Sequence, residues 1–150
     1  AESSRQSFQA EDGHDYSNHC DAEMLDALVF NVFPNFSPWG GFPPNVVYRW
    51  RPNGWDVDST IMEVLMLKRN PLNGEELPVA DIKWLDEDQD WASAEEVGAL
   101  GPIFDQDMAN LSYVQKGMKA SHRKKVSLAN YQEVRVRHFH QIMDRYLYES

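Results

Sequence analysis

Asp107 is the residue whose type and position most directly suggest chemistry. Residues 101–120 carry apolar side chains at Ile103, Leu111 and Val114, at the spacing of one helix face. Asp107 lies four residues from both Ile103 and Leu111, so a regular helix turns its carboxylate toward that face. An unpaired carboxylate in an apolar setting costs several kcal/mol. We therefore expect a cation, a set of hydrogen-bond donors or a metal to meet Asp107.

A second explanation of the acids in this stretch needs no ligand. If the helix begins near Pro102, Asp105 and Asp107 both fall close to its first turn. Acidic side chains there are stabilised by the positive end of the helix dipole and by free backbone N–H groups. Asp105 points away from the apolar face. The pattern alone leaves both the dipole explanation and the ligand explanation of Asp107 open.

The elements before this helix have the composition of strands. Residues 28–34 form a β-branched and aromatic run that proline ends, which predicts one strand. Residues 35–44 are rich in proline and glycine and predict an irregular loop. Residues 45–51 and 59–68 predict a hairpin, because an Asn-Gly turn pair lies between them. The second of these strands is apolar on both faces, which favours a central place in the sheet.

Helices are predicted at both ends of the chain. A short helix within residues 17–27 is expected to bury Met24, and residues 130–148 predict a long amphipathic helix that packs on other elements. Residues 1–16 carry mostly polar side chains and are expected to form a flexible or incomplete segment. Residues 17–150 then make up the folded part.

Composition narrows the class of protein. The 150-residue chain has 42% hydrophobic and 12% aromatic residues, enough for the core of one domain. With 14 Lys and Arg against 24 Asp and Glu, its net charge of −10 argues against nucleic acid as a partner. No apolar run is long enough to cross a membrane, and the single cysteine, Cys20, fits a reducing compartment. We expect a cytoplasmic protein.

Five segments of the chain, taken in order, resemble the Rieske non-haem iron ring-hydroxylating oxygenases. They are FPN at 33–35, YRWRPNG at 48–54, IMEV at 61–64, FDQD at 104–107 and ANYQE at 129–133. The resemblance is to the carboxyl-terminal part of the catalytic domain of the large (alpha) subunit. It implies an α+β, helix-grip (START-like) fold, in which an antiparallel sheet packs on a long C-terminal helix and encloses an apolar substrate cavity. The chain is then expected to be only the C-terminal part of that domain.

The resemblance also implies an iron ligand. In this family two histidines and one carboxylate hold a mononuclear Fe(II), and the carboxylate comes from a Phe-x-x-Asp segment. Here that segment runs from Phe104 to Asp107, so Asp107 becomes the expected catalytic metal ligand. Some members carry a further Asp at the next position, which is Met108 here, and Asp105 remains the alternative ligand. Val29, Trp39 and Phe104 are expected to line the substrate pocket.

The other cofactors of the family have no counterpart in these residues. The Cys-x-His and Cys-x-x-His pairs of a 2Fe-2S Rieske cluster are absent, and so is the Asp-x-x-His-x-x-x-x-His run that provides the two iron-binding histidines. We expect both motifs to precede residue 1 in a longer oxygenase subunit, and we expect the chain by itself to be inactive.

The activity implied by the resemblance is hydroxylation, or oxidative demethylation, of a small aromatic substrate with dioxygen. NAD(P)H would supply electrons through a reductase, with or without a ferredoxin, and the complete subunit would form a homotrimer or an alpha-beta hetero-oligomer. The alternative is a stand-alone helix-grip domain that binds an apolar small molecule without catalysis. An enzyme that needs no iron is the least favoured interpretation, because no nucleophile and base stand in a recognisable arrangement.

Overall fold

The computed structural model describes residues 1–149, which divide into two compact units, residues 1–80 and the part from residue 81 on. The first unit contains helices α1 (Glu2–Asp12) and α2 (Asp21–Leu25) and strands β1 (Leu28–Val29), β2 (Phe36–Gly40), β3 (Val46–Asn53) and β4 (Asp56–Met66). The second contains the 3-10 helices η1 (Trp91–Ser93) and η2 (Glu95–Leu100) and the α-helices α3 (Gly101–Met108), α4 (Leu111–Ala120) and α5 (Val134–Tyr148). The chain therefore has the predicted α+β class.

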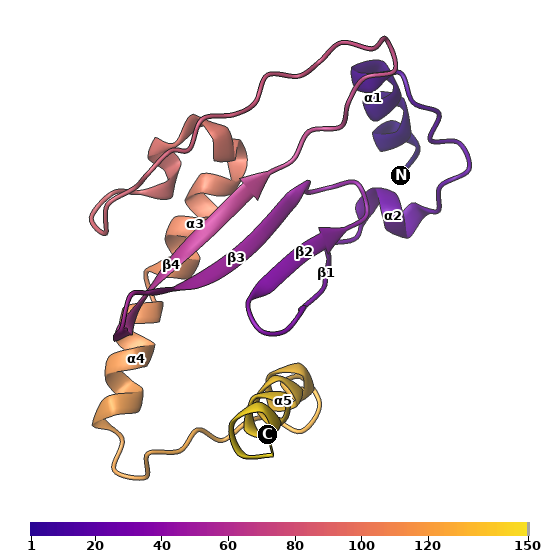
Figure 1. Cartoon of the computed structure of the whole chain (residues 1–150). Helices are drawn as coiled ribbons and strands as arrows, with labels where there is room; N and C mark the ends of the chain where they lie inside the picture. The colour runs from indigo at the N-terminus through magenta and orange to yellow at the C-terminus, as the bar shows by residue number, and fades with distance from the viewer. Residues whose placement is uncertain (150) are drawn as a thin grey trace. The chain divides into compact units, whose positions relative to one another are not determined.

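The four strands form one antiparallel sheet in the order β1-β2-β3-β4 (Figure 1). The predicted hairpin is confirmed, because β3 and β4 pair from Val46 opposite Met66 to Asn53 opposite Asp56. Gly54 stands in the turn with φ +60°, a conformation that glycine adopts without strain. The register places Arg49 opposite Glu63, and the Nε atoms of Arg49 and Arg51 both donate to the Glu63 carboxylate.

Strand β2 lies in the segment that was predicted to be a loop, and the predicted strand 28–34 is reduced to β1 and an isolated bridge between Val32 and Phe36. Proline and glycine are accommodated in β2 for identifiable reasons. Pro38 takes part through its carbonyl, which accepts a hydrogen bond from the Phe30 N–H at 3.0 Å. At Gly40 a Cβ would lie 2.6 Å from the Phe30 ring, so the aromatic side chain packs directly on the glycine backbone.

The prediction of a central place for β4 is wrong within the described residues, where β4 is an edge strand. Its apolar side chains are covered only in part, and Leu65 is 44% exposed. Composition predicted burial on both faces, but a strand becomes central only when a second strand pairs with it. Residues 67–90 follow β4 without forming a strand or a helix.

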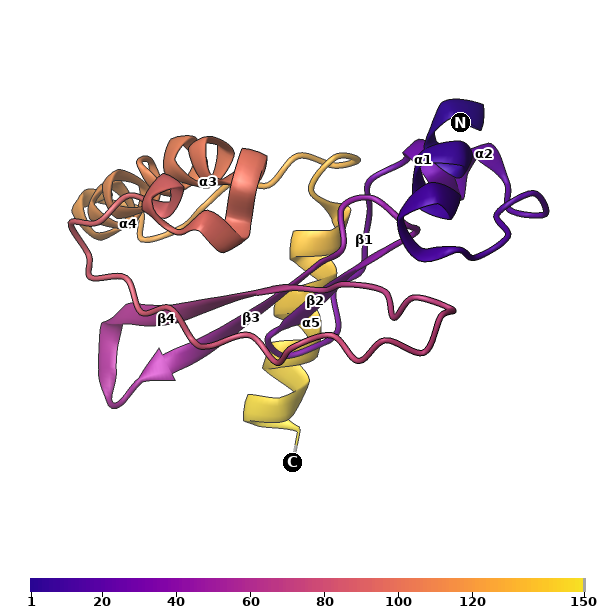
Figure 2. The ribbon, with the colours of Figure 1, turned by 90° about the horizontal axis from the view of Figure 1, so that it is seen from above.

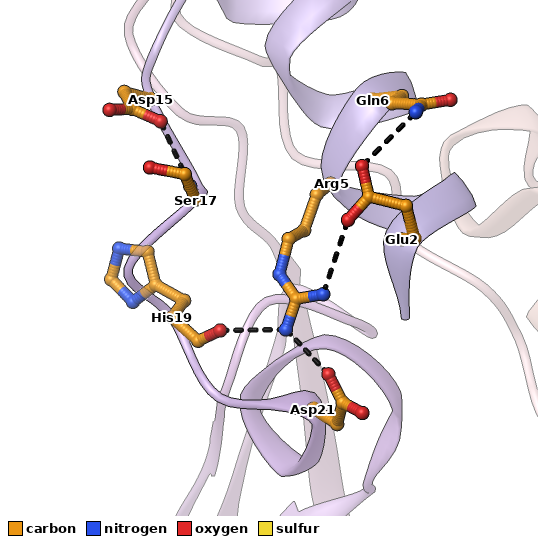
Figure 3. A network of polar contacts seen from close by, with 7 residues as sticks. All are labelled: Glu2, Arg5, Gln6, Asp15, Ser17, His19 and Asp21. Atoms are coloured by element: carbon orange, nitrogen blue, oxygen red, sulfur yellow. Dashed lines mark hydrogen bonds and ion pairs between the residues drawn. The ribbon is translucent and has the colours of Figure 1, made fainter.

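Helix α1 occupies residues that were expected to belong to a flexible or incomplete segment. It lies with α2 beyond one end of the sheet (Figure 1). Arg5 joins the two helices, because its NH2 group donates to the His19 carbonyl at 2.7 Å and to the Asp21 carboxylate at 2.5 Å (Figure 3). Met24 in α2 is fully buried, as predicted. The polar composition of α1 did not predict a folded helix, because the hydrogen-bond partners of Arg5 lie 14 and 16 residues further along the chain, at His19 and Asp21.

A buried carboxylate anchors α1 to the end of the sheet. Asp12 is only 5% exposed, and its Oδ2 accepts hydrogen bonds from the Tyr16 hydroxyl at 2.5 Å and from Arg69 Nε at 2.6 Å. Burial raises the pKa of Asp12, but these bonds and one from the His14 backbone N–H outweigh it and lower the pKa to about 2. The Arg69 guanidinium also lies 4.5 Å from the ring centre of Phe8. We call Asp12, Tyr16 and Arg69 the Asp12 cluster.

The second unit has a small core where α3 packs on the two 3-10 helices. Phe104 is 3% exposed and meets Trp91 edge to face, with ring centres 5.5 Å apart. Gly101 is needed at this junction, because a Cβ there would lie 2.7 Å from the Cα of Ala92. Helix α4 continues the chain directly after α3 (Figure 2). The predicted long C-terminal helix is present as α5, with 15 residues.

Candidate functional site

The helix that carries Asp107 differs from the predicted one in where it begins and ends. Helix α3 begins at Gly101, has a proline in its first turn and ends at Met108, and α4 starts only at Leu111. Asp107 is therefore in the last turn of α3, and the first turn of this helix contains no acidic residue. The negative end of the helix dipole disfavours an acid there. The dipole of α3 consequently does not explain Asp107.

The buried face of α3 is also not the predicted one. Gly101 and Phe104 are buried, whereas Asp107 is exposed and Ile103 is 50% exposed. The prediction that the Asp107 carboxylate faces the interior is thus wrong for the described residues. The reason is that Phe104 and the close approach at Gly101 set the rotation of this short helix, and the spaced apolar residues do not.

The apolar positions that were predicted to share the face of Asp107 are about half exposed. The exposed fractions are 50% for Ile103, 54% for Leu111 and 53% for Val114. Asp107 is itself exposed, one helical turn from Ile103, and an exposed carboxylate keeps its charge at little cost. It is available to a ligand from outside the helix.

Asp105 and Asp107 differ in what their carboxylates bind. Asp105 accepts hydrogen bonds from two backbone N–H groups, that of Trp91 at 2.6 Å on Oδ1 and that of Ala92 at 3.2 Å on Oδ2. Within residues 1–149, Asp107 makes no side-chain hydrogen bond and no ion pair. Asp105 thus already serves the fold with both oxygens, while both oxygens of Asp107 are open.

Two of the three expected pocket residues come together in the sheet. Val29 and Trp39 are direct cross-strand partners of β1 and β2. Val29 is 52% exposed, and Trp39 packs edge to face on Tyr48 with ring centres 6.0 Å apart. The Trp39 Nε1 atom is buried and has no hydrogen-bond partner in the described part of the chain. Phe104 belongs to the core of the second unit.

A hollow of about 310 Å³ beside the Asp12 cluster was not predicted from the sequence. It is lined by His14, Asp15, Tyr16, His19, Phe42 and Arg69. The charge of Arg69 is matched there by Asp12, and its planar group already faces aromatic rings. The signal was hard to find because Asp12 and Arg69 are 57 residues apart.

The described residues do not by themselves provide the donors of an iron site. Among residues 1–149, no three His, Cys, Asp or Glu side chains lie close enough together to hold a metal ion. A ferrous site of two histidines and one carboxylate needs two nitrogen donors beside an acid. Asp107 can supply the acid alone. No helix in residues 1–149 is both long enough and apolar enough to span a membrane.

Comparison with known proteins agrees with the α+β architecture. The model of the family described as ring hydroxylating alpha subunit, catalytic domain, matches residues 2–149. The chain belongs to this family, whose members are oxygenases that use iron. Searches of curated proteins and of solved structures returned no match.

Proposed function

We propose that this chain is part of the catalytic subunit of a Rieske-type non-haem iron oxygenase and that Asp107 is the carboxylate ligand of its mononuclear Fe(II). The observation that carries the proposal is the contrast between the two acids of the Phe104–Asp107 segment. Asp105 has both oxygens engaged by backbone N–H groups, whereas Asp107 is exposed and has no partner in residues 1–149. Family membership supports an oxygenase as the parent protein.

The iron site is then shared between this chain and other residues of the complete subunit. Asp107 contributes one anionic oxygen, and two histidines from the remainder of the subunit contribute the nitrogen donors. Bound Fe(II) would supply the reaction with dioxygen that hydroxylation requires. The role of this chain is to hold the Asp107 carboxylate at a fixed place and to keep it free of competing cations.

The finer assignment follows the family resemblance. The substrate is a small aromatic compound that is hydroxylated or oxidatively demethylated, and Val29, Trp39 and Phe104 line its pocket in the complete helix-grip domain. NAD(P)H supplies electrons through a reductase, with or without a ferredoxin, and then through a 2Fe-2S Rieske cluster outside these residues. We further propose a cytoplasmic subunit that assembles as a homotrimer or an alpha-beta hetero-oligomer.

The proposal is tested by replacing Asp107 with Asn in the complete subunit. The substitution keeps the shape of the side chain but removes the anionic oxygen, so mononuclear iron and oxygen uptake should both fall by more than about 100-fold. The visible absorption of the Rieske cluster should persist. Asp88→Asn, at an exposed acid of the same unit, serves as the matched control and should keep full iron content.

Three outcomes contradict the proposal. Retained iron and activity in Asp107→Asn, with loss of iron in Asp105→Asn, would move the ligand by two residues. Retention of iron in both variants would remove α3 from the active site. Stoichiometric Fe(II) bound by residues 1–150 alone would contradict the idea of a shared site.

A further inference from the structure

Asp105 makes a contact that its own helix does not require. Helix η1 begins after Asp90, whose side chain does not cap it. The first two N–H groups of η1, those of Trp91 and Ala92, are satisfied by Asp105, which lies 14 and 13 residues further along the chain. A carboxylate that accepts bonds from the N-terminal N–H groups of a helical turn is a charged cap, and charged hydrogen bonds are the stronger kind.

The same junction is closed by packing on either side of this cap. Gly101 lets the backbone of α3 approach Ala92, and Phe104 meets the Trp91 ring edge to face. Phe104 and Asp105 lie three and four residues after Gly101, so all three residues are on one side of the helix. That face of α3 is therefore held against η1 at three consecutive points.

Asp107 points away from the contact with η1, because it lies outside the packed face of α3. Each residue of an α-helix turns by about 100°, so Asp107 lies about 160° around the axis from Asp105 and about 60° from Phe104, just outside the packed face. A helix that is fixed along one face presents its remaining side chains in one orientation only. The burial of Phe104 and the exposure of Asp107 agree with this arrangement.

We propose that Asp105 is a positioning residue for the Asp107 carboxylate. By capping η1 it fixes the rotation and height of α3, and so the place at which Asp107 meets its metal. This inference rests on the proposed function of Asp107 and adds a role for the neighbouring acid, which the sequence offered only as the alternative ligand. Asp105 touches neither the metal nor the substrate in this arrangement.

The test compares graded variants of Asp105 in the complete subunit. Asp105→Ala removes both acceptors, whereas Asp105→Asn keeps one, so the first should act more strongly than the second. Both should retain most of the mononuclear iron, yet product formed per dioxygen consumed should fall by about tenfold in Asp105→Ala. Glu96→Gln, at an exposed acid of η2, is the control and should match the unmodified subunit.

Two readouts separate positioning from a merely structural role. Nitric oxide added to the Fe(II) subunit should give an electron paramagnetic resonance spectrum with altered rhombicity in the Asp105 variants. Hydrogen exchange at the amides of Trp91 and Ala92, followed by mass spectrometry, should become at least about tenfold faster. Faster exchange with an unchanged spectrum and unchanged coupling of product to dioxygen would overturn the proposal.

Other outcomes are equally decisive. Loss of iron from Asp105→Asn to the level of Asp107→Asn, with the fold intact, would make Asp105 a ligand and overturn the positioning role. If Asp105→Ala does not fold, Gly101→Ala disturbs the same junction and leaves both acids in place. If a folded Gly101→Ala subunit forms as much product per dioxygen consumed as the unmodified subunit, the positioning role is also overturned. Retained iron in Asp107→Asn is the separate result that defeats the proposed function.

Discussion

Asp12 and Asp107 show two ways in which this chain places a carboxylate near apolar side chains. Asp12 is buried among aromatic rings and receives hydrogen bonds from Tyr16, Arg69 and a backbone N–H. Asp107 stands on an exposed surface beside Ile103 and has no partner in the described residues. The first acid has its cation within the chain, and the second is open to one from outside. The comparison separates an acid used for folding from an acid available for function.

Asp12→Asn is expected to cause the largest loss of unfolding free energy among the variants that test this comparison. The change leaves the Arg69 guanidinium without its buried counter-charge, and breaking such a pair costs about 3 kcal/mol of unfolding free energy. Urea denaturation of the 150-residue chain, followed by far-ultraviolet circular dichroism, measures the change. A loss below about 1 kcal/mol would mean that the Asp12 cluster does not anchor α1.

The pH dependence of stability should report the same carboxylate. The pKa of Asp12 is lowered to about 2 in the folded chain, from an ordinary value of 3.8. Stability from this group is therefore complete above pH 4 and is lost as the pH falls toward 2, by about 2 kcal/mol. Urea midpoints measured from pH 5 to pH 2 should decline more for the unmodified chain than for Asp12→Asn. Parallel profiles would contradict the low pKa.

Removing one donor of the cluster should have an intermediate effect. In Tyr16→Phe the ring keeps its contacts with Phe8 and Phe42, but the hydroxyl that donates to Asp12 is lost. The expected cost is about 1–2 kcal/mol. Burial and the bond to Asp12 also raise the pKa of Tyr16 to about 12, so the ring should resist ionisation in an ultraviolet titration up to pH 11. Ionisation near pH 10 would argue against the buried contact.

A smaller effect is expected where an acid is paired on a more open surface. Glu63 lies between Arg49 and Arg51 on the sheet, and the two arginine side chains are 49% and 41% exposed. The hydrogen bond from Arg49 lowers the pKa of Glu63, although its burial acts in the opposite direction. Glu63→Gln should cost less than about 1 kcal/mol, and 1 M salt should reduce the difference further. An effect as large as that of Asp12→Asn would remove the distinction between the two settings.

The smallest change in stability is expected at Asp107 itself. Because Asp107→Asn breaks no contact within residues 1–149, the unfolding free energy of the chain should stay within about 0.5 kcal/mol of the original. The same urea experiment tests it beside Asp12→Asn. A large loss would show that Asp107 supports the fold, which would weaken its assignment as a free ligand.

The sequence by itself determined several local elements and the family. The hairpin of β3 and β4, the burial of Met24 and the long helix α5 follow from residue patterns that span only a few neighbouring positions. Five short segments in order, Phe104–Asp107 among them, indicated the family, which the match over residues 2–149 shows. These features depend on turn chemistry, periodicity and motif order, all of which can be read along the chain.

The tertiary structure decided what is paired across long separations. It showed β2 inside a segment rich in proline and glycine, where the side chain of Phe30, the residue that follows β1, packs on Gly40. It showed the hydrogen bond between Asp12 and Arg69. It also showed that Asp105 accepts a hydrogen bond from the first residue of η1, whereas Asp107 is exposed. Helical periodicity assigned the wrong face to Asp107, because the rotation of an eight-residue helix is set by the contacts at Gly101 and Phe104. Such contacts join residues whose separation in sequence carries no periodic signal.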